Sequence, residues 1–445
     1  MTPLTLLPRF RKLDRALSTL ADAEAWPRER IEAHQLERIH ALWTHAVRCV
    51  PYYRALHETR PFPEAFESLD HFCSAVPLLP KDVVRAEPAR LLAEGYEAGR
   101  WHRTGGSTGV PMRVFWSRDA HQTGLRIKYR AEAARGLGVF DRKAFLWGHG
   151  ASMAGGWRGA VARLRQPVED RLRRRMRLSA YRLGQADLDG YLDAIARFAP
   201  LGLYGYSSAV SLLAQAARRR AWECPSLRLV TLSAEPAYDW IVREAAEGLG
   251  AEVLVEYGSV ECGVMATQDA RGDLRIREDH VLLETLPADE EGRYPLVVTV
   301  LYNPAFPLIR YPIGDLTSAP IDKPAVGFTR LADVLGRDND LLWSKQGRAV
   351  HPLAVKHVVE HVGEVRRFSA HQKADGSLEV LLETNAVVPV DPIADRLSQL
   401  LSGFVVRVRC VDALEGNAAG KHRWVLSDYE PRQAARWDAE EARGV

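Results

Sequence analysis

The sequence of 445 residues has few cysteines, a small net charge and no long apolar run. Its five cysteines are scattered and form no CxxC pair, which argues against a disulfide framework or a structural zinc site and favours a reducing compartment. A net charge of +3 gives no general case for nucleic-acid binding. No apolar run reaches membrane-spanning length and the N-terminus lacks the apolar core of a signal peptide, so we expect a cytoplasmic protein without a membrane span.

The chain also lacks a Walker phosphate-binding loop and a recognisable Ser/His/Asp set. Its glycine-rich stretch Thr104–Pro111, TGGSTGVP, fails the GxxxxGK[ST] spacing and has no lysine after its last glycine. It nevertheless holds three glycines and three hydroxyl residues in eight positions. Closely spaced backbone N–H groups and hydroxyls can cradle a polyphosphate. The alternative is an ordinary Gly/Ser/Thr turn.

Apolar and polar segments alternate in a way that predicts more than one domain. The chain is too long for one ordinary core, and with 47% hydrophobic and 26% charged residues it has a globular composition. Alternating strands and helices in its middle part indicate a layered α/β domain. We expect a hairpin around the glycine-rich stretch, strands at 201–206, 227–232 and 252–256, helices at 118–136, 187–198 and 240–249, and a further helix capped by Ser207 and Ser208.

A polar, glycine-led segment, Leu335–Asp340, interrupts the apolar pattern and marks the predicted domain boundary. Beyond it, we expect strands at 341–343, 347–350, 377–384 and 405–411 and helices at 352–361 and 393–401. This order predicts a small α+β domain of the ββαβαβ kind. The expected fold is therefore α/β, with a large layered α/β domain at residues 1–335 and a small C-terminal α+β domain at residues 336–445. Near the end of the small domain, a glycine-bearing loop carries Lys421.

Arginines gather between residues 158 and 182, where five of them occupy positions 171 to 177. We interpret this segment as the solvated face of a helix in an arginine-rich sequence. A patch for nucleic acid or acidic lipid is the alternative.

Polar groups and carboxylates follow two neighbouring predicted strands. One strand ends in Ser233–Pro236, SAEP, and the next runs into Glu256–Glu261, EYGSVE. In open α/β sheets, ligands lie at the carboxyl ends of the strands. Tyr257 can stack on a planar base and Glu261 can hold Mg²⁺ near phosphates, or Tyr257 is a core residue and Glu261 a helix N-terminal acid. A later strand end presents Asp315, a carboxylate suited to ribose hydroxyls.

Six motifs together resemble the adenylate-forming superfamily, and within it the phenylacetate–CoA ligase branch that includes the CapK-like proteins. Each motif is weak alone, but all six occur in the family's order and spacing over roughly residues 100–425. The resemblance implies an adenylate-forming domain followed by a mobile C-terminal domain that carries the adenylation lysine. The motifs are TGGSTGVP at Thr104–Pro111, SAEP at Ser233–Pro236, EYGSVE at Glu256–Glu261, PLIRYPIGD at Pro307–Asp315, GRDND at Gly336–Asp340 and GK at Gly420–Lys421.

The resemblance implies a role for individual residues. Tyr257 would stack on the adenine, Asp315 would accept hydrogen bonds from the ribose and Glu261 would bind Mg²⁺. Lys421 would bridge the carboxylate and the α-phosphate, so the catalytic residues would be Thr104, Glu261 and Lys421. The ATP site would comprise Thr104, Gly105, Gly106, Ser107, Thr108, Gly109, Ser233, Ala234, Glu235, Glu256, Tyr257, Gly258, Ser259, Asp315 and Arg337.

The implied acyl pocket would hold three aromatic residues, which favour an aromatic or other flat small acid over a long alkyl chain. Packing residues of the core are the alternative for all three. The pocket would be lined by Trp147, His149, Tyr204, Tyr206 and Ser207.

The chain departs from the family pattern at three places. Val110 stands where many relatives carry lysine, so Arg103 or Arg113 would have to supply that cation. Asn339 stands at the expected hinge, in place of the usual aspartate or lysine. The segment 322–327 has none of the cysteines that bind zinc in some relatives, so we expect no zinc.

The resemblance implies ATP and Mg²⁺ as cofactors and a small carboxylic acid as substrate. The acyl group would pass to a thiol, of CoA or of an acyl or peptidyl carrier protein. An amide-forming ligase that uses an amine acceptor is the alternative within the class. A nucleotide-binding scaffold without turnover is the alternative outside it, although Lys421, Glu261 and Asp315 weigh against that. The sequence leaves open whether the chain acts alone or as a homodimer.

Overall fold

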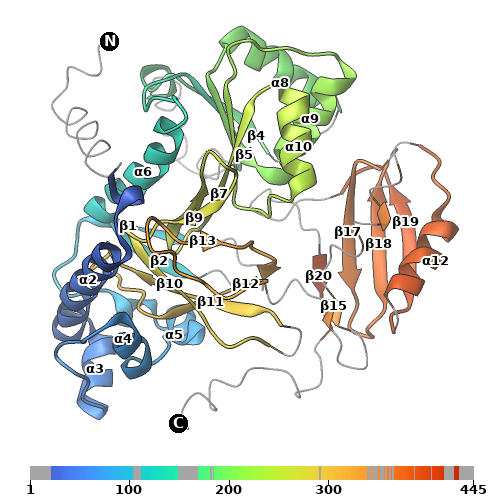
Figure 1. Cartoon of the computed structure of the whole chain (residues 1–445). Helices are drawn as coiled ribbons and strands as arrows, with labels where there is room; N and C mark the ends of the chain where they lie inside the picture. The colour runs from blue at the N-terminus through green and yellow to red at the C-terminus, as the bar shows by residue number, and fades with distance from the viewer. Residues whose placement is uncertain are drawn as a thin grey trace, which may run out of the picture.

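The computed structural model describes most of the chain between residues 22 and 429. The described residues are 22–103, 112–148, 169–180, 183, 185–289, 292–337 and, with short gaps, 342–429. Figure 1 shows an N-terminal part built on two main sheets and a C-terminal sheet at the edge of the view.

The described N-terminal segment is helical and is divided at Pro51. Helix α2 ends at Cys49 and α3 begins at Pro51, because proline fits the first turn of a helix but not its interior. Ile39 and Trp43 of α2 are buried against the second sheet described below. The helices are η2 (Asp22–Ala25), α2 (Arg28–Cys49), α3 (Pro51–Thr59), α4 (Leu69–Ala75), α5 (Lys81–Ala86) and η3 (Pro88–Leu91).

The central sheet has the strand order β13-β9-β8-β7-β6-β5-β3-β4. Strands β4, β3, β5, β6 and β7 run parallel, and β8, β9 and β13 continue the sheet in antiparallel pairs. The strands are β3 (Lys143–Trp147), β4 (Arg175–Ser179), β5 (Gly202–Tyr206), β6 (Leu229–Ser233), β7 (Glu252–Ser259), β8 (Gly263–Gln268), β9 (Leu274–Ile276) and β13 (Arg330–Leu331).

Helices cover both faces of this sheet (Figure 1). Side chains alternate along a strand, so Leu229 packs with Ala131 of α6 on one face, whereas Val230 faces the core that contains Ile241 of α10. A mostly parallel sheet covered on both faces is the α/β layer that the sequence predicted. The helices are α6 (Arg118–Ala133), α8 (Gln185–Phe198), α9 (Ser207–Arg219) and α10 (Asp239–Leu249).

A second, antiparallel sheet lies against the N-terminal helices. Its strand order is β10-β11-β12-β14, and the predicted hairpin around the glycine-rich stretch forms a separate antiparallel pair, β1–β2. The strands are β10 (Val281–Thr285), β11 (Tyr294–Val300), β12 (Tyr311–Thr317), β14 (Gly336–Arg337), β1 (Gly99–Arg103) and β2 (Arg113–Ser117).

The C-terminal sheet, in the order β19-β18-β17-β20, shares no strand with the other sheets in the described parts of the chain. Helix α12 packs on it (Figure 1). The sequence analysis identified β18, β19, α12 and the β15–β16 hairpin but missed β17 and β20. The elements are β15 (Leu342–Trp343), β16 (Ala349–Val350), β17 (Arg367–Gln372), β18 (Leu378–Glu383), α12 (Val390–Leu400), β19 (Val406–Val411) and β20 (Val425–Ser427). The boundary at 335/336 stays a prediction, and β14, just beyond it, pairs with β12 of the second sheet.

Two local predictions are wrong. Ser207 and Ser208 do not cap α9, because its N-cap is Tyr206 and the serines are the first helical residues. A carboxylate from another segment takes that role, since the Ser208 backbone N–H donates to Glu235 Oε2 at 2.9 Å. The arginine-rich segment is not helical throughout: Arg175 begins strand β4, and its guanidinium donates to the Tyr129 hydroxyl at 2.8 Å.

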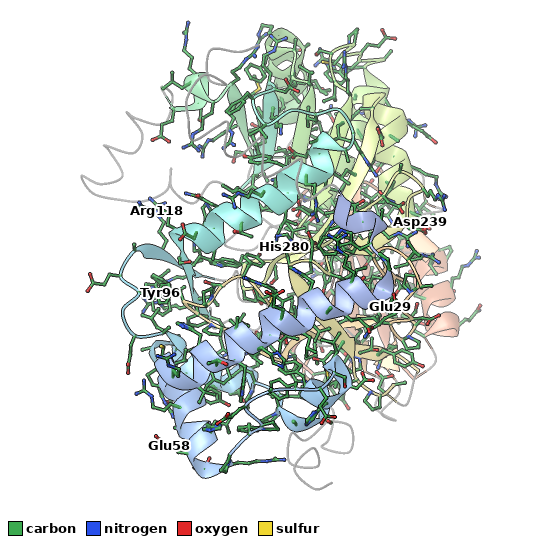
Figure 2. The ribbon with its side chains drawn as sticks, turned by 60° about the vertical axis from the view of Figure 1, so that its left-hand side comes forward. Glu29, Glu58, Tyr96, Arg118, Asp239 and His280 are labelled. Atoms are coloured by element: carbon green, nitrogen blue, oxygen red, sulfur yellow. The ribbon has the colours of Figure 1, made fainter. Side chains whose placement is uncertain are left out.

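Buried ion pairs fasten α2 and α6 to the segment that precedes β10. Figure 2 shows His280 of this segment between the two helices. Arg28 of α2 binds Glu278 at 2.8 and 3.1 Å, and Arg130 of α6 binds Asp279 at 2.5 and 3.1 Å. Burial by itself would raise the pKa of Asp279, but the neighbouring His280 and Arg130 hold it well below its usual range.

We predict that Asp279→Asn lowers the unfolding free energy by about 3–5 kcal/mol, since it leaves the Arg130 guanidinium buried without its counter-charge. Because the folded-state pKa of Asp279 is lowered, the difference from the wild type is present above about pH 4 and shrinks as the pH falls below it. Urea unfolding at several pH values measures it. The control Asp273→Asn removes a more exposed ion-pair partner of Arg275 and Arg330, and it is expected to cost at most about 1 kcal/mol. Equal losses for the two variants would contradict the assignment.

Candidate active site

The candidate site is built around the end of β7 and the turn that follows it. Strand β7 continues through Tyr257 to Ser259, so the predicted turn begins later than the sequence suggested. A Cβ atom at Gly258 would lie 2.5 Å from the carbonyl oxygen of Gly263, so only glycine allows the two backbones this close approach. The turn Val260–Cys262 then leads into β8.

Two predicted nucleotide-binding residues, 58 positions apart in the sequence, are in contact beside this turn. The Tyr257 hydroxyl donates to Asp315 Oδ2 at 2.7 Å. Asp315 lies on β12, and the β12–β14 register places Arg337 directly opposite it. The structure therefore brings an aromatic hydroxyl on β7 into contact with a carboxylate on β12, and the backbone of β14 pairs beside that carboxylate.

Glu261, at the centre of the turn, is 4% exposed. Its carboxylate accepts no hydrogen bond and forms no ion pair within the part of the chain that the structure describes. A buried carboxylate without a donor or a counter-charge is costly, and a cation would relieve that cost. Since Mg²⁺ is commonly held by one or two carboxylates together with substrate phosphates, Glu261 fits the predicted metal role. No cluster of three His, Cys, Asp or Glu side chains occurs among the described residues.

Two aromatic side chains that sequence reasoning missed hold the turn in place. Trp116 Nε1 donates to the Val260 carbonyl oxygen at 3.0 Å, and the Tyr302 hydroxyl donates to the Cys262 carbonyl oxygen at 3.3 Å. Trp116 lies on β2, directly after the glycine-rich stretch, so one side chain connects that hairpin to the turn of Glu261. No motif or spacing in the sequence points to either contact.

Lys81 is a further residue that the sequence analysis did not nominate. It begins α5, and its Nζ donates to the Ile313 carbonyl oxygen at 2.9 Å, two residues before Asp315. Burial raises the pKa of the Cys262 thiol, the charge of Glu261 adds to that rise, and the Lys81 ammonium opposes it. Lys81 therefore brings a positive charge near the turn, whereas Arg113, one of the residues expected to compensate for Val110, stacks over the Trp101 ring at 4.7 Å.

The neighbouring strand ends form a second group of contacts. Ser233 Oγ and the Tyr204 hydroxyl both donate to Glu256 Oε1, at 2.9 and 2.7 Å. Glu235, which follows Ala234 in the SAEP motif, contacts the start of α9 through Ser208, as described above. The side chain of Glu256 thus points away from the Tyr257–Asp315 contact.

Three residues of the predicted acyl pocket, Trp147, Tyr204 and Tyr206, form one aromatic cluster at the ends of β3 and β5. The rings of Trp147 and Tyr206 are 4.0 Å apart between centroids, and those of Trp147 and Tyr204 are 5.1 Å apart. Tyr204, Tyr206 and Ser207 are buried. Their role as pocket walls stays a prediction.

Several predicted residues lie outside the described part of the structure. They are Thr104, Gly105, Gly106, Ser107, Thr108, Gly109, His149, Asn339 and Lys421. Their roles stay predictions from the sequence. Among the described helices, none has both the length and the apolar character needed to cross a membrane.

The chain is similar in sequence to proteins of known name. It is 29% identical to the phenylacetate-coenzyme A ligase of Thermus thermophilus over 364 residues, which cover 77% of this chain and 78% of that protein. The chain is thus similar to a phenylacetate–coenzyme A ligase over most of its length. Protein CapK of Staphylococcus aureus is 24% identical over 278 residues, which cover 61% of this chain and 60% of CapK. No protein-family model matches the chain.

A solved structure confirms the fold. The crystal structure of 2-hydroxyisobutyryl-CoA ligase in the postadenylation state, in complex with R3-HIB-AMP, matches with a TM-score of 0.73 at 19% identity. The match covers 92% of this chain and 91% of that chain. This match confirms the predicted fold, and the resemblance to phenylacetate–CoA ligases is confirmed by the sequence relatives.

We predict that Gly263→Ala destabilises the protein more than Gly95→Ala does. Both glycines have positive φ, +73° and +83°. A Cβ atom at Gly263 would lie 2.5 Å from the Tyr302 hydroxyl oxygen, whereas one at Gly95 would meet nothing within 4 Å. Each variant is expected to lose about 1 kcal/mol from backbone strain, and Gly263→Ala a further 1–3 kcal/mol from overpacking, in urea unfolding. Equal losses would show that Tyr302 does not confine this turn.

Proposed function

We propose that the chain activates a small carboxylic acid with ATP as an acyl-adenylate and then transfers the acyl group to a thiol. The relatives named phenylacetate-coenzyme A ligase support this, as does the matching ligase structure that contains an acyl-AMP. The observation that carries the proposal is the meeting of Tyr257 and Asp315 beside the buried carboxylate of Glu261.

In this proposal each residue binds a different part of the ATP–Mg²⁺ complex. Asp315 accepts hydrogen bonds from the ribose hydroxyls, and Tyr257, oriented by its bond to Asp315, presents its ring to the adenine. Glu261 holds Mg²⁺, which when bound supplies positive charge beside the phosphates. The backbone N–H groups of Thr104–Gly109 hold the β- and γ-phosphates.

The first half-reaction joins two anions. A carboxylate oxygen of the acid attacks the α-phosphorus, the bond to the bridging oxygen of pyrophosphate breaks, and pyrophosphate leaves. Fixed positive charge lowers the barrier where negative charge concentrates, and Lys421 supplies it from the C-terminal domain. In the second half-reaction a thiolate attacks the acyl carbon and AMP leaves. Residues 336–445 move between these steps as a unit about the segment Arg337–Asn339.

The acid is aromatic or otherwise flat, in keeping with the Trp147–Tyr206 cluster. CoA is the favoured acceptor because the relatives are CoA ligases. Pyrophosphate exchange over a panel of acids tests the proposal, followed by product analysis with CoA, carrier protein or amine. ATP binding without exchange for any acid would favour a non-catalytic scaffold instead.

We predict that Asp315→Ala weakens ATP binding about 10- to 150-fold in calorimetry, since a hydrogen bond to a charged group contributes about 1.5–3 kcal/mol. The control Asp333→Ala removes an aspartate that accepts bonds from Thr317 Oγ1 and the Ser318 backbone N–H. It is expected to lose stability but to keep its ATP affinity. Unchanged affinity in a folded Asp315→Ala protein would remove Asp315 from the nucleotide site.

We predict that Lys421→Ala reduces pyrophosphate exchange on the order of 10²–10³-fold and leaves the melting temperature unchanged. The variant should still transfer the acyl group from a supplied acyl-adenylate, because that step does not need the α-phosphate bridged to a free carboxylate. The control is Lys373→Ala, a lysine of the same domain that pairs with Glu379 at 3.1 Å. Near-normal exchange in Lys421→Ala would overturn the adenylation mechanism.

A further inference from the structure

Glu256, which the sequence analysis placed in the ATP site, is a buried carboxylate with no part in the contacts to ATP proposed above. It is 7% exposed and lies one residue before Tyr257 on β7. Because adjacent side chains of a strand point to opposite faces, Tyr257 reaches Asp315 while Glu256 turns toward Tyr204 and Ser233. Glu256 therefore belongs with the aromatic cluster.

The two oxygens of this carboxylate differ. Oε1 accepts both hydroxyl hydrogen bonds, from Tyr204 and Ser233, whereas Oε2 accepts none from the residues that the structure describes. A carboxylate oxygen offers two lone pairs, so Oε2 can accept a hydrogen bond from a ligand.

A positive charge, that of Lys128, lies over the Tyr204 ring. Lys128 of α6 places its Nζ 3.1 Å from the centroid of this ring. Burial lowers the pKa of Lys128, and the negative charge of Glu256 opposes that shift, so the ammonium and the carboxylate act on each other. Lys128 and Glu256 both contact Tyr204, whose ring centroid lies 5.1 Å from that of Trp147. A flat ring in this cluster would meet aromatic faces and one carboxylate oxygen.

We propose that Glu256 selects the acid: its Oε2 accepts a hydrogen bond from an amino or hydroxyl group on the ring of an aromatic acid. This inference rests on the proposed adenylation function and names its substrate class. A site built to hydrogen-bond a substrate hydroxyl or amine discriminates strongly against the analogue without it, because the buried acceptor is then left unpaired. Unsubstituted aromatic acids are therefore poor substrates of this chain.

The experiment compares benzoate and phenylacetate with their 3- and 4-hydroxy and 3- and 4-amino derivatives. Calorimetry measures binding of each acid to the full chain, and pyrophosphate exchange measures turnover. We expect the best substituted acid to exceed its unsubstituted parent about 10- to 100-fold in both, as a charge-assisted hydrogen bond would give. Glu256→Gln keeps the shape, replaces an acceptor by a donor and should erase this preference. Tyr204→Phe removes one donor that orients the carboxylate and should reduce the preference in part.

Glu244→Gln is the matched control. Glu244 is a half-buried glutamate of α10 that accepts a hydrogen bond from Ser211, and its replacement should leave the preference unchanged. A preference for unsubstituted acids, no binding of any acid, or an unchanged preference in folded Glu256→Gln would each overturn the inference. Glu256-dependent binding of a substituted acid without exchange would support the inference while the adenylation function fails.

Discussion

The alternation of side chains along β7 is the constraint on which the candidate site depends. One strand supplies Tyr257 to one side and Glu256 to the other, so the nucleotide contacts and the aromatic cluster lie back to back. A displacement of β7 by one residue against its neighbours would exchange the two faces. Its pairing with β6 in parallel and β8 in antiparallel fashion fixes that register from both edges.

The turn after β7 depends on packing from distant segments. Trp116 and Tyr302 each donate a hydrogen bond to a backbone carbonyl of this turn, at 3.0 and 3.3 Å, and both belong to the main core around the second sheet. This arrangement keeps the Glu261 carboxylate buried where the cost of an unpaired charge is high. Such a carboxylate can bind a cation, because cation binding lowers the free-energy cost of keeping its negative charge buried.

Buried ion pairs hold two helices against the sheets that carry the site. Arg28 and Arg130 join α2 and α6 to adjacent residues, Glu278 and Asp279, and β10 begins soon after them. The orientation of the first helices relative to both sheets is thereby fixed by directional contacts as well as by apolar burial. Lys81, at the start of a short helix on the same side, then lies beside the strand that carries Asp315.

The sequence by itself determined most helices and strands and the kinds of side chain that form the candidate site. Periodicity identified most helices and strands, and the six motifs indicated the family, because glycines, carboxylates and aromatics at strand ends leave a local pattern. It missed β4, the antiparallel strands β8 to β11, and β17 and β20. The last two, RFSAHQ and VLS, show no strong alternation and become strands only when they pair with neighbours. Only the tertiary structure decided that Tyr257 meets Asp315, that Glu235 rather than a serine caps α9, and that Glu256 faces Tyr204. The reason is that these contacts join residues between 27 and 58 positions apart, and their geometry follows from strand order and register, which no local pattern encodes.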